Sequence, residues 1–303
     1  MDERYLLIRG DDLGVTHAAN EGFRKFAQMG VLSAWSIMAP CPWFMEAVTL
    51  AKEFPEVDLG MHLTLMSEWE GYRWSPVLGA ARVPSLVDKN GYFYSDPIGL
   101  ILANPSMEEL EAELRAQVER ALDNGLNVRY IDNGHGNLGV MVPRINKIFN
   151  KLIKDYNLEV STFNFDPTQE SINNAPLTPE AKLKAYGEWL ALPDSPPVYR
   201  QRIVHPMEDT PEQRALKLSG AFDIPFLQGI IFQNLAEVLT LPTQAFKDEV
   251  KKTGHKIIHF NDLKEEDKSH HLDLWPVEIT QQMFAIMGTS PETIEKIMTS
   301  FAL

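Results

Sequence analysis

Arg9-Gly10-Asp11-Asp12-Leu13-Gly14 is the stretch around which the rest of this chain is organised. It follows the apolar run Tyr5-Leu6-Leu7-Ile8, which predicts a buried strand, and it precedes a helix-like segment that begins near Thr16. Its two neighbouring carboxylates therefore stand where a strand ends and a turn begins. Adjacent negative charges are unfavourable without a cation or a shared proton. A turn followed by a helix cap is the other interpretation, and for these four residues alone it is the commoner one.

Length and composition are those of an ordinary globular protein. The chain has 303 residues, of which 44% are hydrophobic and 23% charged, and its net charge is −14. The length allows one α/β barrel or two smaller domains. The negative charge argues against nucleic acid and anionic membranes as partners. The single cysteine, Cys41, excludes an internal disulfide and leaves histidine and aspartate for any metal chemistry. Because we find neither a leader segment nor an apolar run of membrane-spanning length, we expect a cytoplasmic location.

Strand-like and helix-like segments alternate along the chain, which predicts βα units and a mainly parallel sheet. Helices are expected at 16–23, 44–51, 106–125 and 179–190, with two more in the last 40 residues. Strands are expected at 5–8, 34–38, 57–65, 128–131, 158–162, 201–205, 229–232 and 256–260.

The segment 66–104 interrupts this alternation and is rich in aromatic residues. A long irregular stretch after a strand is usually functional or disordered, and the aromatic content argues against disorder. Two roles stay open for these rings: they stack on sugar rings, or they anchor the loop to the body of the protein. The rings belong to Trp69, Tyr72, Trp74, Tyr92, Phe93 and Tyr94.

Polar residues that can carry chemistry stand in or just after the expected strands. Each has an ordinary structural explanation by itself, such as a satisfied core histidine or a loop-capping aspartate. In a βα barrel, however, the carboxyl ends of the strands meet on the face where active sites are built. One carboxylate with two imidazoles can hold a divalent ion, and a second carboxylate beside it can act as a general base. The residues are Asp11, Asp12, His62, Asp132, His135 and His205.

Taken in order, the motifs resemble those of the YdjC-like carbohydrate deacetylases, relatives of the chitooligosaccharide deacetylases, over about residues 4–263. The resemblance implies an α/β fold, a distorted (β/α) barrel like a TIM barrel, over residues 1–263. It leaves 264–303 as a C-terminal helical extension, which we expect to pack on the barrel. The matching motifs are Asp11-Asp12-Leu13-Gly14, Met61-His62-Leu63-Thr64-Leu65, Ser67-Glu68-Trp69, Tyr72-Arg73-Trp74, 83–88, Gly91-Tyr92-Phe93, Ile131-Asp132-Asn133 and Val204-His205-Pro206.

The same resemblance implies a function and a set of roles. The family removes acetyl groups from N-acetylated sugars by attack of metal-activated water, so we expect one divalent ion, Zn²⁺ or Mg²⁺. Asp12, His62 and His135 would bind the metal, Asp11 would be the general base, and His205 the general acid. The residues that we expect to bind the carbohydrate substrate are Asp132, Trp69, Tyr72 and Trp74.

One departure from the family pattern bears on the metal site. The family reads Asp-Ser-His after the fourth strand, whereas this chain reads Asp132-Asn133-Gly134-His135, with the histidine one position later. Either the turn holds one more residue and His135 still reaches the metal, or the third ligand is lost. Gly134 and Gly136 favour a reshaped turn. The alternatives are a non-catalytic carbohydrate-binding protein and a hydrolase of another amide or ester. A homodimer is possible.

Overall fold

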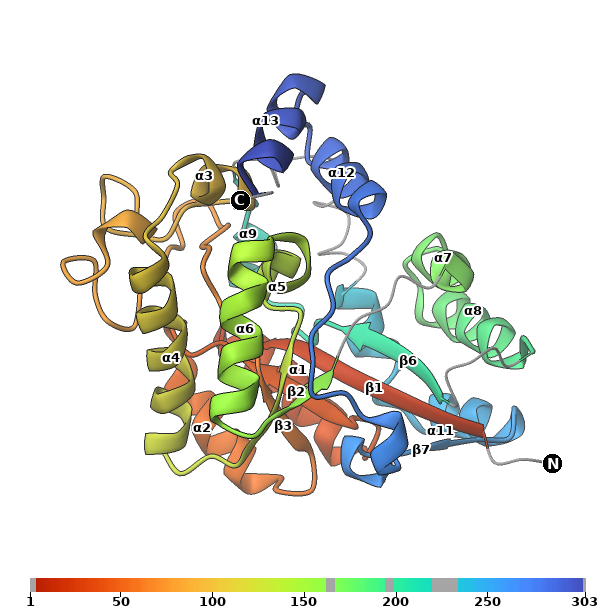
Figure 1. The fold of residues 1–303 in the computed structure, drawn as a ribbon. Coiled ribbons are helices and arrows are strands. Elements are labelled where there is room, and N and C mark those ends of the chain that lie inside the picture. The colour runs from red at the N-terminus through yellow and green to blue at the C-terminus, as the bar shows by residue number, and fades with distance from the viewer. Residues whose placement is uncertain (1–3, 162–166, 194–198, 220–233, 302–303) are drawn as a thin grey trace.

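A parallel sheet built around the strand β1 (Arg4–Leu13) forms the centre of the molecule (Figure 1). The computed structural model describes residues 4–161, 167–193, 199–219 and 234–301. The strands lie in the order β5-β4-β3-β2-β1-β6, and β7 also pairs with the start of β1. The other strands are β2 (Ala34–Ile37), β3 (Asp58–Met61), β4 (Val128–Asp132), β5 (Glu159–Ser161), β6 (Tyr199–Val204) and β7 (His255–Ile257).

All ladders of this sheet are parallel, and the sheet curls into a half-barrel surrounded by helices. The α/β fold and the distorted barrel predicted from the sequence are therefore confirmed. Both faces of the sheet are covered, which explains the nearly continuous apolar strands. Leu7, Ile8, Trp35, Met61 and Ile131 are fully buried. The strand expected at 229–232 lies outside the described residues.

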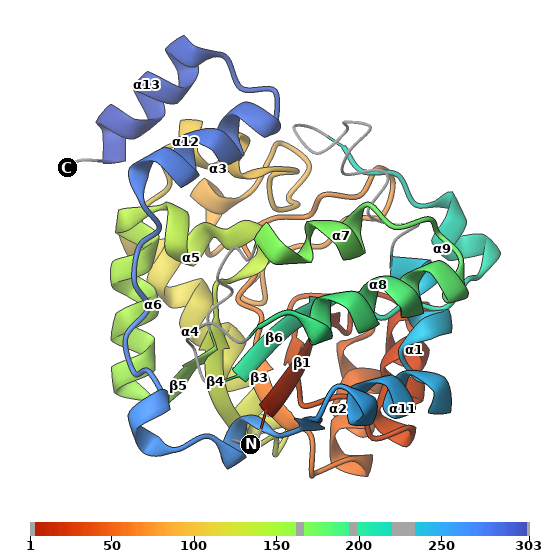
Figure 2. The same ribbon diagram turned by 90° about the vertical axis from the view of Figure 1, so that its right-hand side faces the viewer.

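Helices follow the strands, as the alternation predicts (Figure 2). The Thr16 hydroxyl caps α1 by accepting a hydrogen bond from the Ala19 amide at 2.9 Å. The longer helices are α1 (His17–Gln28), α2 (Phe44–Glu53), α4 (Met107–Asp123), α6 (Pro143–Asp155), α8 (Pro179–Ala191), α11 (Gln244–Lys252), α12 (Val277–Ile286) and α13 (Pro291–Phe301). The shorter ones are η1 (Pro84–Leu86), α3 (Pro97–Leu102), η2 (His135–Asn137), α5 (Leu138–Met141), η3 (Pro167–Gln169), α7 (Glu170–Asn173), α9 (Pro211–Ala215), η5 (Phe260–Asp262) and η6 (Glu265–Asp267).

The segment after residue 263 lies against the outer edge of the sheet and against α6. The Val160 amide of β5 donates to the Ser269 carbonyl at 2.8 Å, so this edge strand is partly covered. The Asn146 amide group of α6 donates to the Leu272 carbonyl at 2.9 Å. Ile297 of α13 is buried within the same apolar cluster as the barrel core. The division into two units at residue 263 stays a prediction, as do the homodimer and the cytoplasmic location. Among the described helices, none is long and apolar enough to cross a membrane.

Three local expectations were wrong in detail. The aspartates were expected after the first strand, but β1 continues through Asp11 and Asp12 to Leu13. Its register against β2 shifts between Gly10 and Leu13, so the aspartates lie in the irregular end of the strand. The strand β3 ends at Met61, and His62 follows it.

The third expectation concerns the start of α4, where Ser106 followed three residues later by Glu109 predicts a capping box. Ser106 caps this helix, but the Glu109 carboxylate accepts hydrogen bonds from Ser85 instead of returning to Ser106. Contacts from a distant loop thus replaced the local pairing that the sequence suggested.

The aromatic loop 66–104 is anchored to the barrel by its own rings. Trp69, Trp74 and Phe93 are buried, and Tyr72 donates its hydroxyl to the Val15 carbonyl at 2.6 Å. The buried Glu113 carboxylate of α4 accepts hydrogen bonds from the Val77 and Leu78 amides further along the loop. These contacts support the anchoring role over the sugar-stacking role for the two tryptophans, and they position the loop over the carboxyl ends of the strands.

Candidate active site

The predicted polar residues gather at the carboxyl end of the sheet because the parallel register brings the strand ends to one edge. Ile37 of β2 pairs with Met61 of β3, which pairs with Ile131 of β4, so His62 and Asp132 follow at neighbouring positions. On the other side of β1, Gly10 pairs with Val204, which places Asp11 and His205 at the next position of each strand.

Asp11 is held by the buried guanidinium of Arg9. The Nε atom of Arg9 donates to Oδ1 of Asp11 at 2.8 Å, and Nη2 donates to Oδ2 at 2.9 Å. The Nη1 atom donates to the carbonyl and the hydroxyl of Ser161. Burial lowers the pKa of Arg9, but Asp11 and Asp132 outweigh burial and raise it, so the guanidinium stays charged. The pair fixes both the orientation and the charge of the Asp11 carboxylate.

His62 links the carboxylates of Asp132 and Asp12. Its Nδ1 atom lies 2.8 Å from Oδ2 of Asp132, and its Nε2 atom lies 3.4 Å from Oδ1 of Asp12. Burial lowers the pKa of His62, but Asp132, Asp11 and Asp12 raise it to about 9. Burial raises the pKa of Asp132, but His62 and Arg9 lower it to about 2. This arrangement fixes the ring and directs Nε2 toward Asp12.

The turn after β4 brings His135 beside His62 despite its shift along the sequence. Gly134, Gly136 and Asn137 all have positive φ, and the His135 amide donates to the Leu63 carbonyl at 2.9 Å. A side chain at Gly134 would also collide with Phe149 and the Leu63 carbonyl. The rings of His62 and His135 are 5.6 Å apart between centroids. The extra residue is therefore absorbed in left-handed backbone, which glycine and asparagine tolerate.

Glu68 completes this group of residues, and sequence reasoning gave it no role. Its Oε1 atom lies 3.3 Å from Nε2 of His135, and both side chains are buried. Burial lowers the pKa of His135, but Glu68 and Asp12 raise it above its usual value. The only sequence signal was a carboxylate inside the motif Ser67-Glu68-Trp69, which by itself is typical of an exposed loop.

Several buried polar atoms at this end of the sheet lack a hydrogen-bond partner among the described residues. Besides the indole nitrogens of Trp69 and Trp74, they include Oδ1 of Asp12, Oε2 of Glu68 and Nδ1 of His135. Unpartnered buried polar atoms are costly, and carboxylate oxygens and imidazole nitrogens are donor types that suit a divalent cation. The Asp12 side chain is 16% exposed, which leaves the site open to solvent on that side.

Among the described residues, the buried group whose ligand atoms all lie within 4.8 Å of one another is Asp11, His62 and Asp132. Both oxygens of Asp11 already accept from Arg9, and Asp132 already accepts from His62 and from the Gly134 amide. Asp11 and Asp132 are therefore already engaged with Arg9 and His62, and the assignment of Asp12, His62 and His135 as metal ligands stays a prediction.

The remaining predicted residues are distributed around this group. His205 follows β6 directly and is half-buried. The next residues of that segment lie against Gly22 of α1, where a Cβ atom would come within 2.6 Å of the Met207 amide nitrogen. Trp74 is only 3% exposed and lies 6.4 Å from the His135 ring between centroids. Asp132 is completely buried behind His62, so we assign to it the orientation of His62 in place of substrate binding.

An exposed aromatic side chain near the site was not singled out by the sequence. Trp43 is 42% exposed, its amide donates to the Gly14 carbonyl at 3.1 Å, and its ring lies 5.1 Å from that of His17. Gly14 is two residues beyond Asp12, so the backbone of Trp43 lies near the carboxyl end of β1, and its exposed ring is a candidate part of the rim of the site. The sequence placed Trp43 only next to Pro42 in a turn, which gave no reason to select it.

Fold and site together define an α/β half-barrel protein with a histidine–aspartate centre at the carboxyl ends of its strands. The chain belongs to the YdjC-like protein family, which it matches over residues 5–266. It is 30% identical to a carbohydrate deacetylase of Brevibacillus brevis over 262 residues, covering 85% of this chain and 99% of that protein. The resemblance noted in the sequence is thereby confirmed.

Two further comparisons bear on length and on fold. A protein of Listeria innocua named carbohydrate deacetylase 1 is 34% identical over 157 residues, which is 51% of this chain and 59% of that protein. The aligned part thus spans about three fifths of that relative. A crystal structure of a candidate cellobiose-phosphate cleavage protein of Enterococcus faecalis shares the fold. Its TM-score is 0.64 at 22% identity, and the match covers 86% of this chain and 98% of that one.

Proposed function

We propose that this protein is a metal-dependent deacetylase that removes the acetyl group from an N-acetylated sugar or oligosaccharide. The observation that carries the proposal is that the two adjacent aspartates have different surroundings. Arg9 holds Asp11 through both oxygens, whereas Oδ1 of Asp12 is buried, makes no hydrogen bond within the described part of the chain and lies 3.4 Å from Nε2 of His62. The family and its named relatives supply the substrate class.

In this proposal Asp12, His62 and His135 hold one divalent ion, Zn²⁺ or Mg²⁺. When bound, such an ion polarises the acetamide carbonyl and makes water a better nucleophile near neutral pH. Asp11 accepts the proton of the attacking water, and Arg9 keeps its carboxylate oriented toward the site. His205, which follows the neighbouring strand β6, donates a proton to the departing amine of the sugar. Asp132 orients His62.

The test is acetate release from a panel of N-acetylated mono- and oligosaccharides with the ion-stripped protein supplied with Zn²⁺, Mg²⁺, Mn²⁺ or Co²⁺ in turn. We expect metal-dependent release from at least one sugar and none from the matching de-N-acetylated sugar. Release of acyl groups only from compounds without a sugar would favour a hydrolase of another amide or ester. Sugar binding without release, with any of the four metals, would favour the carbohydrate-binding alternative and contradict the proposal.

A further inference from the structure

We propose that Glu68 positions His135 so that His135 binds the metal through Nδ1, while His62 binds through Nε2. The inference deepens the proposed function, since it concerns the metal site on which that function rests. Glu68 is a positioning residue in this proposal and not a ligand itself. The two histidines of the site would then present opposite ring nitrogens, each selected by a buried carboxylate on the other nitrogen.

Each of the two histidines has a buried carboxylate beside one ring nitrogen, and the nitrogen differs between them. Asp132 lies 2.8 Å from Nδ1 of His62, which leaves Nε2 free to face Asp12. Glu68 lies 3.3 Å from Nε2 of His135, and Nδ1 of that ring is buried without a hydrogen-bond partner in the described part of the chain. A neutral imidazole donates a proton from one nitrogen and offers a lone pair at the other. A carboxylate that accepts from one nitrogen therefore selects the other as the ligand.

The shift of His135 along the sequence gives this choice a physical reason. Nδ1 is bonded to the ring carbon that carries Cβ, so it lies nearer the backbone than Nε2 does. The turn at Gly134 and Gly136 brings the backbone of His135 close to the site, with its amide bonded to the Leu63 carbonyl. In this proposal, His135 therefore reaches the metal with the ring nitrogen nearer its backbone.

The backbone that carries Glu68 is held by hydrogen bonds to neighbouring segments. Its carbonyl accepts hydrogen bonds from the amide of Ser219 at 2.7 Å and from the hydroxyl of Ser219 at 2.8 Å. The preceding Ser67 donates its amide to the Tyr94 carbonyl and accepts from the Trp74 amide. The Trp74 ring lies 6.4 Å from the His135 ring between centroids. A rotation of His135 would thus bury the Glu68 carboxylate without its partner.

The decisive measurement is nitrogen-15 NMR of the Zn²⁺-loaded protein with labelled histidine, because the long-range couplings identify which ring nitrogen coordinates. Assignments come from His62→Gln and His135→Gln. We expect coordination by Nε2 of His62 and by Nδ1 of His135. Coordination of His135 through Nε2, or the absence of His135 from the metal, would overturn the proposal.

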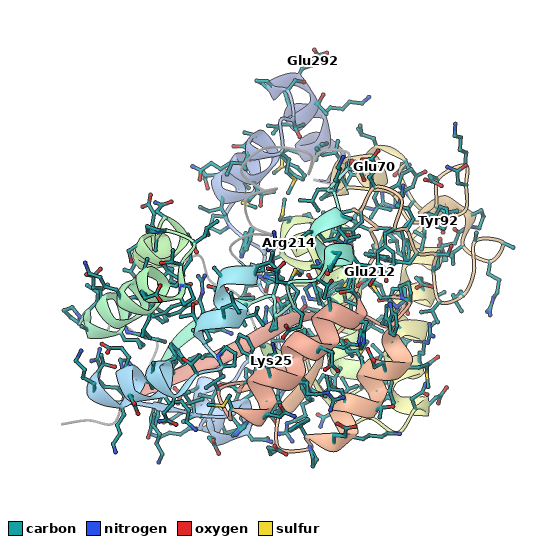
Figure 3. All side chains as sticks on the ribbon, turned by 180° about the vertical axis from the view of Figure 1, so that it is seen from behind. Lys25, Glu70, Tyr92, Glu212, Arg214 and Glu292 are labelled. Atoms are coloured by element: carbon teal, nitrogen blue, oxygen red, sulfur yellow. The ribbon has the colours of Figure 1, made fainter. Side chains whose placement is uncertain are left out.

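Metal affinity, measured by competition with a chelator of known affinity, tests the role of Glu68. Glu68→Ala should weaken Zn²⁺ binding by about 10- to 100-fold, the usual effect of losing a residue that orients a ligand. Glu68→Gln keeps an acceptor oxygen for Nε2 of His135 and should recover most of the affinity. The matched control is Glu70→Gln, since Glu70 is an exposed carboxylate of the same loop (Figure 3). If Glu68→Gln loses as much affinity as Glu68→Ala, the carboxylate is a direct ligand and the positioning role is wrong.

These outcomes separate this inference from the proposed function. Protein that binds Zn²⁺ through Nδ1 of His135 but releases no acetate would leave the inference intact and contradict the deacetylase. Protein that releases acetate with His135 bound to Zn²⁺ through Nε2 would support the deacetylase and contradict the inference. Circular dichroism of each variant verifies folding, and if Glu68→Ala does not fold, the Glu68→Gln affinity and the NMR assignment decide.

Discussion

The Nδ1 atom of His62 lies 2.8 Å from the Oδ2 atom of Asp132, and these two residues are 70 positions apart in the sequence. The contact orients the ring whose other nitrogen faces Asp12. Asp132→Asn removes the charge while keeping an acceptor of the same shape. We expect Zn²⁺ affinity to fall by about 10- to 100-fold, because the orienting carboxylate also raises the basicity of its histidine. Chelator competition measures the change.

The matched control for Asp132→Asn is Asp58→Asn. Asp58 is also a buried carboxylate, but it lies at the opposite end of β3 and accepts hydrogen bonds from Asn261. Both substitutions should lower the thermal midpoint, and only Asp132→Asn should weaken metal binding. Equal metal affinity in the two variants would contradict the role given to Asp132.

The adjacent aspartates should separate into a metal ligand and a base. Asp12→Ala should lose metal and activity together, because it removes a proposed ligand oxygen that lies 3.4 Å from Nε2 of His62. Asp11→Asn should keep the metal and lose turnover, since an amide cannot accept the proton. Asn retains one acceptor for Arg9, so its cost in unfolding free energy should stay below the about 3–5 kcal/mol of a broken buried pair. Full turnover by Asp11→Asn would refute its assignment as the base.

Metal binding should depend on pH through His62. In the metal-free protein the pKa of His62 is raised to about 9, above the value of about 6.5 expected in the unfolded chain. Its protonated form therefore stabilises the metal-free fold below pH 6.5, and this contribution is lost as the pH rises through 9. A bound metal must displace that proton. We expect Zn²⁺ affinity to rise with pH up to about 9, by up to tenfold per unit for one proton.

Calorimetry checks this linkage. Titrations at pH 7 in two buffers with different ionisation enthalpies should report the release of about one proton for each ion bound. Asp132→Asn should reduce the proton release, because it removes the largest charge that raises the pKa of His62. An affinity that stays constant from pH 6.5 to 8.5 would show that His62 is already neutral in the metal-free protein.

Gly22 should matter for catalysis although it lies on α1, away from the metal site. A Cβ atom there would lie 2.6 Å from the Met207 nitrogen and 2.8 Å from the Pro206 carbonyl carbon. Gly22→Ala must therefore move the segment that carries His205. We expect kcat to fall by about tenfold or more, since a displacement of about 1 Å can cost 100-fold, with Zn²⁺ affinity unchanged. Gln28→Ala, at an exposed position of the same helix, is the control and should leave kcat unaltered.

Trp43 should contribute to substrate binding at the rim of the site. It is the exposed ring beside Gly14, whereas Trp69 and Trp74 are buried. Trp43→Ala should raise KM by about 3- to 10-fold, the scale of one aromatic stacking contact, with little change in kcat. Met45→Ala removes an exposed apolar side chain two residues later and serves as the control. An unchanged KM for every sugar that is hydrolysed would exclude Trp43 from the binding surface.

Much of the fold was predictable because its signals are local. The apolar run before Asp11 gave β1, the Thr16 cap gave the start of α1, and the Ser106 cap gave the start of α4. Element ends were less predictable. His62 lies beyond β3 because the ladder with β2 stops at Met61, and this depends on the length of the neighbouring strand.

The site was predictable in its residues but not in its contacts. The order of motifs selected Asp11, Asp12, His62 and His135, yet it gave no partner for any of them. The sequence places Arg9 directly after a predicted strand and Glu68 in the irregular segment 66–104, and neither position indicates a partner. Both are buried against site residues, and burial is decided by which segments fold over one another.

The sequence by itself determined the alternation of strands and helices, the chemical types at the strand ends and the family to which the chain belongs. These features depend on residue identity and on short spacings along the chain, so neighbouring residues are enough to reveal them. Only the tertiary structure decided that Arg9 holds Asp11, that Asp132 and Glu68 hold opposite nitrogens of two histidines, and that a turn in left-handed backbone returns His135 to the site. The physical reason is that each of these contacts depends on strand register, backbone angle and burial, which are set by segments far apart in the chain.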